Sequence, residues 1–86
     1  MAGSQEVLEL QRQINRFREE LAFPELALTG VLDQTTVWLV AKVFNAFAIR
    51  GAASVTQQAV AGNPAEYAAS LKQVADGGGS AEVPSA

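Results

Sequence analysis

The stretch DQTTVWLVAKVFNAFAIR, residues 33–50, decides the fold of this chain. Its hydrophobic residues recur at helical spacing and cover most of the circumference of a helix, which is typical of a central helix. The β-branched residues raise a strand as the alternative, but about 17 residues without a turn signal exceed the length of an ordinary strand. Asp33 is suited to be the N-cap and Gly51 to be the C-terminal stop. We therefore predict one buried helix over residues 33–50.

An amphipathic segment precedes the central helix. Hydrophobic residues at spacings of three and four predict a helix from about Gln5 to Leu21, with one apolar face formed by Val7, Leu10, Ile14, Phe17 and Leu21. Pro24 disfavours helix at Phe23, and an irregular stretch with a turn at Gly30 is expected up to Leu32.

The C-terminal half contains two further helix signals. Ser54 and Gln57 have capping-box spacing, which predicts a short helix over residues 54–61. Asn63 followed by Pro64 predicts another helix over residues 64–75. Residues 77–86 are rich in glycine and are predicted to form a flexible tail. The expected fold is an all-α bundle of three to four helices, with one domain over residues 1–76 and the tail at 77–86.

Length and charge limit the possible partners. The chain has 86 residues, enough for one compact domain, and its net charge of −3 gives no general attraction for nucleic acid. No apolar run approaches the roughly 20 residues that span a bilayer, and the N-terminus lacks a signal-peptide pattern. We expect a protein without a membrane span, made in the cytoplasm and free to join a virion or injection particle.

Catalytic chemistry has little support in the composition. The chain contains no cysteine and no histidine, which removes thiolate chemistry, imidazole-based acid–base catalysis and nearly all zinc sites. Glu19 and Glu20 are adjacent, so their side chains should diverge and not form the opposed pair that glycoside hydrolysis requires. We predict no enzyme activity, no metal site and no cofactor.

The segment VLELQRQIN, residues 7–15, resembles the opening helix of peptidoglycan-binding-like domains. Gly30-Val31-Leu32, Thr36 and Leu39-Val40 are similar in type and spacing to that family's turn, helix-opening threonine and Ala-Val pair. The resemblance covers about residues 7–47 and implies a compact three-helix bundle. It departs from the family pattern at three places, which are Thr29 before Gly30, Asp33 in place of a turn glycine, and Val43-Phe44 in place of a Phe-Gln pair.

Four residues are candidates for ligand binding. Gln11 and Asn15 lie four residues apart on one helix face and could together bind an amide or a hydroxyl, with loop groups near Gly30. The alternative is that their amides bind loop carbonyls inside the bundle. Trp38 is either an exposed platform for a sugar ring or a buried core residue.

Two functions remain open from the sequence. The resemblance implies a noncatalytic module that docks onto cell-wall peptidoglycan or a wall-associated protein. The alternative is a small structural subunit of a larger homo- or hetero-oligomeric assembly, such as a phage tail or contractile injection apparatus, that contacts its protein partners through its tail and through Leu39, Phe44 and Ile49.

Overall fold

The computed structural model describes residues 4–77 and 81–84. Over these residues the chain forms four α-helices and one short 3-10 helix, with no strand, so the prediction of a small all-α bundle is confirmed. The elements, in chain order, are α1 (Gln5–Asn15), α2 (Gln34–Ala46), η1 (Ala52–Ser54), α3 (Gln57–Gly62) and α4 (Pro64–Ala75).

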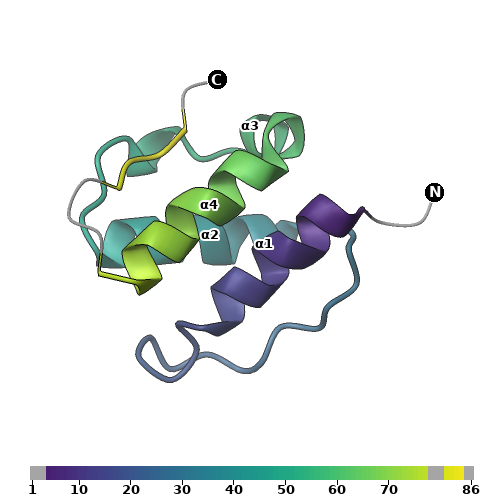
Figure 1. The fold of residues 1–86 in the computed structure, drawn as a ribbon, viewed down its shortest axis with the longest axis horizontal. Helices are drawn as coiled ribbons and strands as arrows, with labels where there is room; N and C mark the ends of the chain where they lie inside the picture. Colours follow the sequence, from purple (N-terminus) through teal and green to yellow (C-terminus); the bar gives the residue numbers. More distant parts are fainter. Residues whose placement is uncertain (1–3, 78–80, 85–86) are drawn as a thin grey trace.

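The first and last helices form the most extensive helix pair. α1 and α4 lie side by side and run in roughly the same direction, and α2 passes behind both of them (Figure 1). Residues 16–33 pass round the outer side of α1 before α2 begins, and the short α3 precedes α4 at one end of the bundle (Figure 1).

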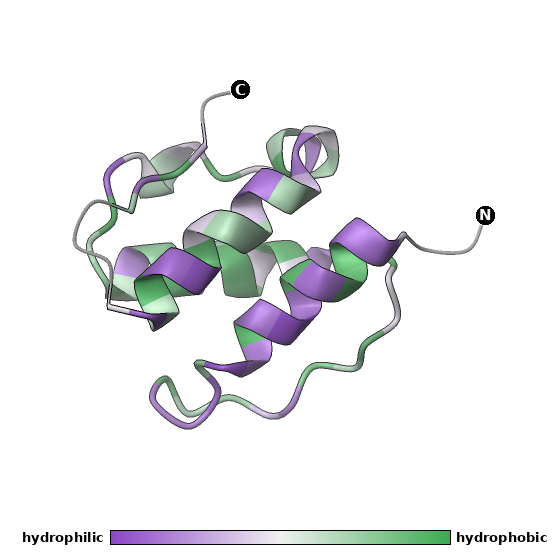
Figure 2. Cartoon of the chain, in the orientation of Figure 1, coloured by the Kyte–Doolittle hydropathy of each residue, from purple (hydrophilic) through white to green (hydrophobic). Residues whose placement is uncertain are grey.

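The core lies between α1, α2 and α4. In Figure 2 much of α1 is coloured hydrophilic, while α2 behind it is largely hydrophobic. Burial of these apolar side chains supplies the main stabilising free energy of the bundle. The fully enclosed residues come from all three helices and from α3: Leu10, Ile14, Val40, Val43, Phe44, Val60 and Leu71.

The first helix begins as predicted but ends earlier. The hydroxyl of Ser4 caps it by accepting a hydrogen bond from the Val7 amide at 3.0 Å. After Asn15 the amides of residues 16–18 bind carbonyls three residues back, so residues 16–22 form turns and not the predicted helix up to Leu21. Phe17 is nevertheless 2% exposed, so the apolar face continues into these turns.

The central helix is also shorter than predicted. Asp33 caps it as expected, because its Oδ1 accepts hydrogen bonds from the amide and the hydroxyl of Thr36 at 2.8 and 2.7 Å. The helix ends at Ala46, because Ala48 adopts a left-handed conformation with φ 55° and the Ile49 amide binds the Phe44 carbonyl at 2.9 Å. The predicted extension to residue 50 is therefore wrong.

Two different caps organise the C-terminal half. Thr56, and not Ser54, caps α3 by accepting a hydrogen bond from the Ala59 amide at 3.1 Å, so the helix predicted over residues 54–61 begins later. The predicted helix over residues 64–75 is found as α4, with Pro64 in its first turn. Gly51 has φ +88° and precedes η1, a position that an L side chain would strain.

The C-terminal segment returns to the bundle. Residues 81–84 lie beside the connection that contains η1, where Arg50 and Glu82 form an isolated parallel β-bridge (Figure 1). Val83 packs against the core. Residues 81–84 of the predicted flexible tail therefore contact the bundle, and positions 78–80 and 85–86 of that tail lie outside the described residues.

Candidate functional site

Gln11 is held inside the protein by the loop that precedes α2. The residue is 0% exposed, and its Oε1 accepts a hydrogen bond from the Gly30 amide at 2.9 Å. Its Nε2 lies 3.1 Å from the Val31 carbonyl and 3.2 Å from the hydroxyls of Thr29 and Thr36. The amide is therefore fully used by the fold, and we remove Gln11 from the candidate ligand-binding residues.

Asn15 and Gly30 have structural roles of the same kind. The Asn15 amide donates to the Leu26 carbonyl at 2.9 Å and accepts from the Leu26 amide at 2.7 Å, so it pairs with one residue of the loop. Gly30 is buried with φ +73°, and a Cβ there would lie 3.1 Å from the Ser4 carbonyl oxygen. Both residues therefore hold the loop against α1, and their contacts favour the structural alternative over ligand binding.

The predicted interface residues of the central helix are covered by the chain itself. Leu39 is 4% exposed and Phe44 is 0% exposed, and Ile49 is partly buried and packs against the core. The enclosure of Leu39 and Phe44 by the elements packed on α2 corrects their prediction as contacts to another subunit, whereas for Ile49 that prediction stays open.

Trp38 is the largest exposed hydrophobic side chain. It is 60% exposed on α2, although Leu39 and Val40, which follow it directly, are buried. Lys42, one turn further on, places its Nζ 5.2 Å from the centroid of the indole ring. This is cation–π geometry, so a positive charge lies over one face of the indole ring.

A hollow next to Trp38 completes the candidate binding surface. It has a volume of 210 Å³ and lies between α2 and the loop after α1, and it is lined by Phe23, Pro24, Glu25, Leu26, Ala27, Thr35, Trp38 and Leu39. Trp38 also lines a second, shallow hollow together with Gln34 and Thr35. We call the surface formed by both hollows the Trp38 surface.

The Trp38 surface can hold a ligand but lacks the groups for covalent chemistry. An apolar hollow beside an aromatic ring supplies contact area, while the amide of Gln34 and the hydroxyl of Thr35 offer hydrogen bonds to a ligand that orient it. Glu25 is the carboxylate that lines this surface. One carboxylate does not make the acid–base pair that hydrolysis by this class of residue requires.

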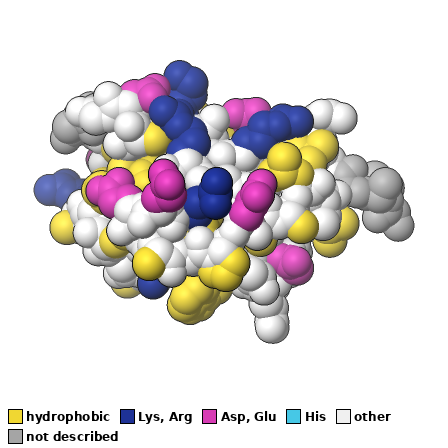
Figure 3. Space-filling model, turned by 90° about the horizontal axis from the view of Figure 1, so that it is seen from below, with side chains coloured by type: hydrophobic (Ala, Val, Ile, Leu, Met, Phe, Trp, Pro, Cys, Tyr) yellow, Lys and Arg dark blue, Asp and Glu magenta, His cyan; other side chains and the backbone are white. Residues whose placement is uncertain are grey.

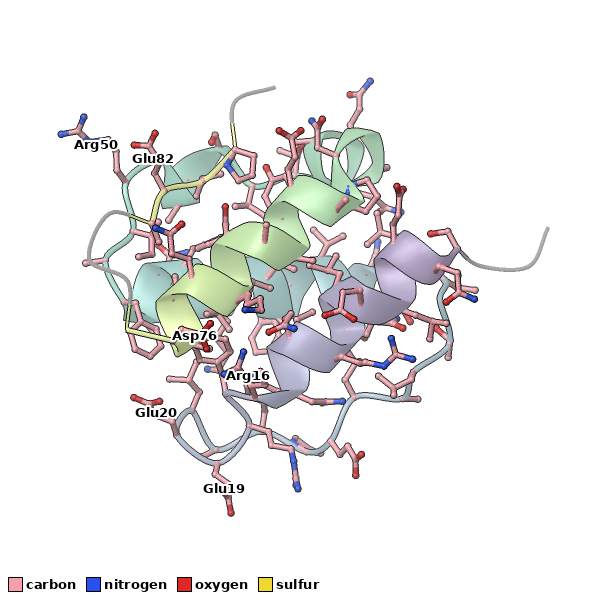
Figure 4. All side chains as sticks on the ribbon, in the orientation of Figure 1. Arg16, Glu19, Glu20, Arg50, Asp76 and Glu82 are labelled. Atoms are coloured by element: carbon pink, nitrogen blue, oxygen red, sulfur yellow. The ribbon has the colours of Figure 1, made fainter. Side chains whose placement is uncertain are left out.

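The remaining carboxylates have structural surroundings. Glu19 and Glu20 point away from each other, as their adjacency predicts (Figure 4). In residues 4–77 and 81–84 no group of acidic residues is arranged to hold a metal ion. Hydrogen bonds lower the pKa of three carboxyl groups: from Gln13 to Glu9, from Thr36 to Asp33 and from Arg16 to Asp76. The Arg16–Asp76 ion pair, 2.8 Å long, ties the end of α1 to the end of α4 (Figure 4).

The face of the molecule that Figure 3 shows has no large patch of only positive or only negative charge. Lys and Arg side chains alternate there with Asp and Glu, and hydrophobic side chains are exposed between them (Figure 3). No helix within the described residues is long and apolar enough to cross a membrane.

The sequence pointed to Trp38 but not to its neighbours in the loop. Residues 23–27 carry no ligand motif, and their place beside α2 depends on Asn15, which holds Leu26. The run Phe23-Pro24 was the available signal, but it indicates only extended backbone before the proline and not a place beside α2. Neither a protein-family model, nor a curated protein, nor a solved structure matches this chain.

Proposed function

We propose that this chain is a noncatalytic binding module that holds peptidoglycan on the Trp38 surface. The observation that carries the proposal is the 60% exposed indole of Trp38 beside an apolar hollow, in a protein whose other large aromatic residues are buried or partly buried. An exposed tryptophan costs solvation free energy in the free protein, and a ligand that covers it recovers that free energy.

The chemistry around Trp38 fits a sugar polymer with acidic substituents. The indole offers a flat apolar face for the C–H side of a sugar ring, and Gln34 and Thr35 offer hydrogen bonds to hydroxyl or acetamido groups. Lys42 places an ammonium group near the ring. Peptidoglycan carries carboxylates on its stem peptides, and Lys42 attracts such groups.

Trp38 supplies its own probe, because it is the single tryptophan of the chain. A titration with soluble peptidoglycan fragments should shift the fluorescence emission of Trp38 to shorter wavelength, since the ligand displaces water from the indole. Retention on insoluble peptidoglycan should fall about tenfold in Trp38→Ala, which corresponds to about 1.4 kcal/mol of lost contact.

Val31→Ala is the matched control, because Val31 is 48% exposed but does not line either hollow at Trp38. The control should be retained like the unmodified chain, and far-UV circular dichroism should show both variants folded. Unchanged fluorescence together with unchanged retention of Trp38→Ala would reject peptidoglycan as the ligand of this surface.

A structural subunit is the second candidate function. Leu28 and Val31, 46% and 48% exposed in the loop before α2, add hydrophobic area that a sugar-binding site does not need. A protein partner would cover these residues as well as Trp38. Loss of partner binding in Leu28→Asp and Val31→Asp, with peptidoglycan retention at background level in every variant, would favour this function over the first.

A further inference from the structure

The C-terminal segment, residues 81–84, occupies a cleft between η1 and α4. The Val83 amide donates a hydrogen bond to the Arg50 carbonyl at 3.2 Å, and the Ser70 hydroxyl of α4 donates to the Glu82 carbonyl at 3.0 Å. Arg50 and Glu82 pair as a parallel β-bridge, and Figure 4 shows both at the same corner of the molecule. The segment therefore binds as a short extended peptide.

The cleft is shaped for the Val83 side chain. A Cβ added to Gly51 would lie 3.3 Å from the Val83 Cβ, so glycine is the residue that admits valine here. The hollow around the segment has a volume of 450 Å³, and it is lined on the cleft side by Arg50, Gly51, Ser54, Ala59 and Tyr67. The cleft thus reaches beyond the four residues that occupy it.

We propose that this cleft, formed by residues 50–54 together with Ala59, Tyr67 and Ser70, binds the C-terminal segment of a second copy of the chain. The bound segment in the structure shows which peptide the cleft accepts: an extended backbone, a β-branched residue at the position of Val83 and a proline after it. Every contact that holds it can form between two chains as well as within one. The site is separate from Trp38, so the proposal does not depend on what the Trp38 surface binds.

The weakness of this contact favours exchange of the C-terminal segment between chains. Two hydrogen bonds and one half-buried valine form a contact too small to bind a free peptide tightly. Within one chain the covalent connection compensates, because it gives the segment an effective concentration on the order of 1 mM. Neighbouring copies in an assembly reach similar local concentrations, so each segment can then bind either the cleft of its own chain or the cleft of the neighbouring chain.

The opposite charges at the bridge also favour a second copy over an unrelated peptide. Arg50 and Glu82 occupy the two bridge positions, and their opposite signs favour the observed register. A partner chain with the same residues reproduces that register, as in the isologous contacts of closed oligomers.

Two variants separate the segment from its cleft. Val83→Asp places a charge where valine packs, which leaves the cleft of that chain open. Gly51→Ala narrows the cleft at the Val83 contact, which leaves the segment of that chain unoccupied. Each variant should be monomeric by light scattering and helical by circular dichroism.

The test mixes the two full-length variants. Nitrogen-15-labelled Val83→Asp chain is titrated with unlabelled Gly51→Ala chain, and the amide resonances of Arg50, Gly51 and Ser70 should shift, with half-saturation in the millimolar range that so small a contact implies. Unlabelled Val83→Asp chain is the matched control and should leave these resonances unchanged. If Gly51→Ala loses helical signal, Ser70→Ala supplies the free segment, because it removes the hydrogen bond to Glu82 and keeps the backbone geometry of Gly51.

Two results would overturn the proposal. One is the absence of shifts at several times the expected half-saturation concentration. The other is an equal response to the Val83→Asp control, since that would assign the contact between chains to another surface.

Discussion

Replacing Gln11 by methionine isolates the hydrogen bonds that hold the loop before α2. Methionine fills nearly the same volume, so little cavity is created. The Gly30 amide, a buried donor, would lose its acceptor at 2.9 Å, which costs about 1–3 kcal/mol. Loss of the Nε2 bonds to Val31 and Thr36 adds about 1 kcal/mol. We expect the free energy of unfolding to fall by about 2–4 kcal/mol.

Urea unfolding followed by circular dichroism measures this loss. Gln58→Met is the matched control, because Gln58 is exposed on α3, and its effect should stay within about 0.5 kcal/mol. A loss below about 1 kcal/mol in Gln11→Met would refute the structural role that we assign to this amide. A binding assay on Gln11 variants would in any case report the stability of the fold and not contact with a ligand.

Two further predictions concern the ends of the central helix. Ala48→Gly should raise the free energy of unfolding by about 1 kcal/mol, because Ala48 has φ 55°, which glycine adopts without strain. Ala46→Gly, in the helix itself, should lower the free energy of unfolding by about 0.5–1 kcal/mol. The urea midpoints of the two variants check both signs. Asp33→Ala should cost about 1 kcal/mol at pH 7. Because the hydrogen bonds from Thr36 lower the pKa of Asp33 below its ordinary value of 3.8, the carboxylate contributes its stability above that pH and loses it as the pH falls through the lowered pKa. The difference in thermal stability between Asp33→Ala and the unmodified chain should therefore shrink as the pH falls through the lowered pKa, and a difference that stays constant with pH would contradict this origin.

Local signals predicted those elements whose determinants lie close together in the sequence. α4 was predicted with its bounds, because Asn63 and Pro64 mark its start and the apolar face through Tyr67 and Leu71 continues without interruption. The start of α2 at Asp33 was predicted for the same reason, since the cap and its partner Thr36 are three residues apart.

The ends of α1 and α2 could not be predicted from local signals. α1 ends at Asn15, where the Asn15 side chain pairs with Leu26 from a loop eleven residues further on. α2 ends because an alanine, Ala48, takes the left-handed conformation that glycine usually provides. In both cases packing elsewhere in the bundle overrides the preference of the nearby residues.

The candidate site was predicted in part. Trp38 was singled out for its residue type, but the sequence left its exposure open, and Leu39 and Phe44 beside it proved buried. Which residues of a nearly all-apolar helix stay uncovered depends on the elements packed around it, and here the contact of α2 with α1, η1, α3 and α4 decides this. The spacing of hydrophobic residues within α2 cannot predict that contact.

The pairing of the first helix with the last sets the order in which the bundle can assemble. A nascent chain that ends before α4 leaves Leu10 and Ile14 without the partner that covers them, so its first half has no finished interior. The chain between the two helices loses entropy when the helices meet, and only their contact offsets that loss. Folding is therefore expected to wait until synthesis has passed Leu71, and to proceed then as a single cooperative step.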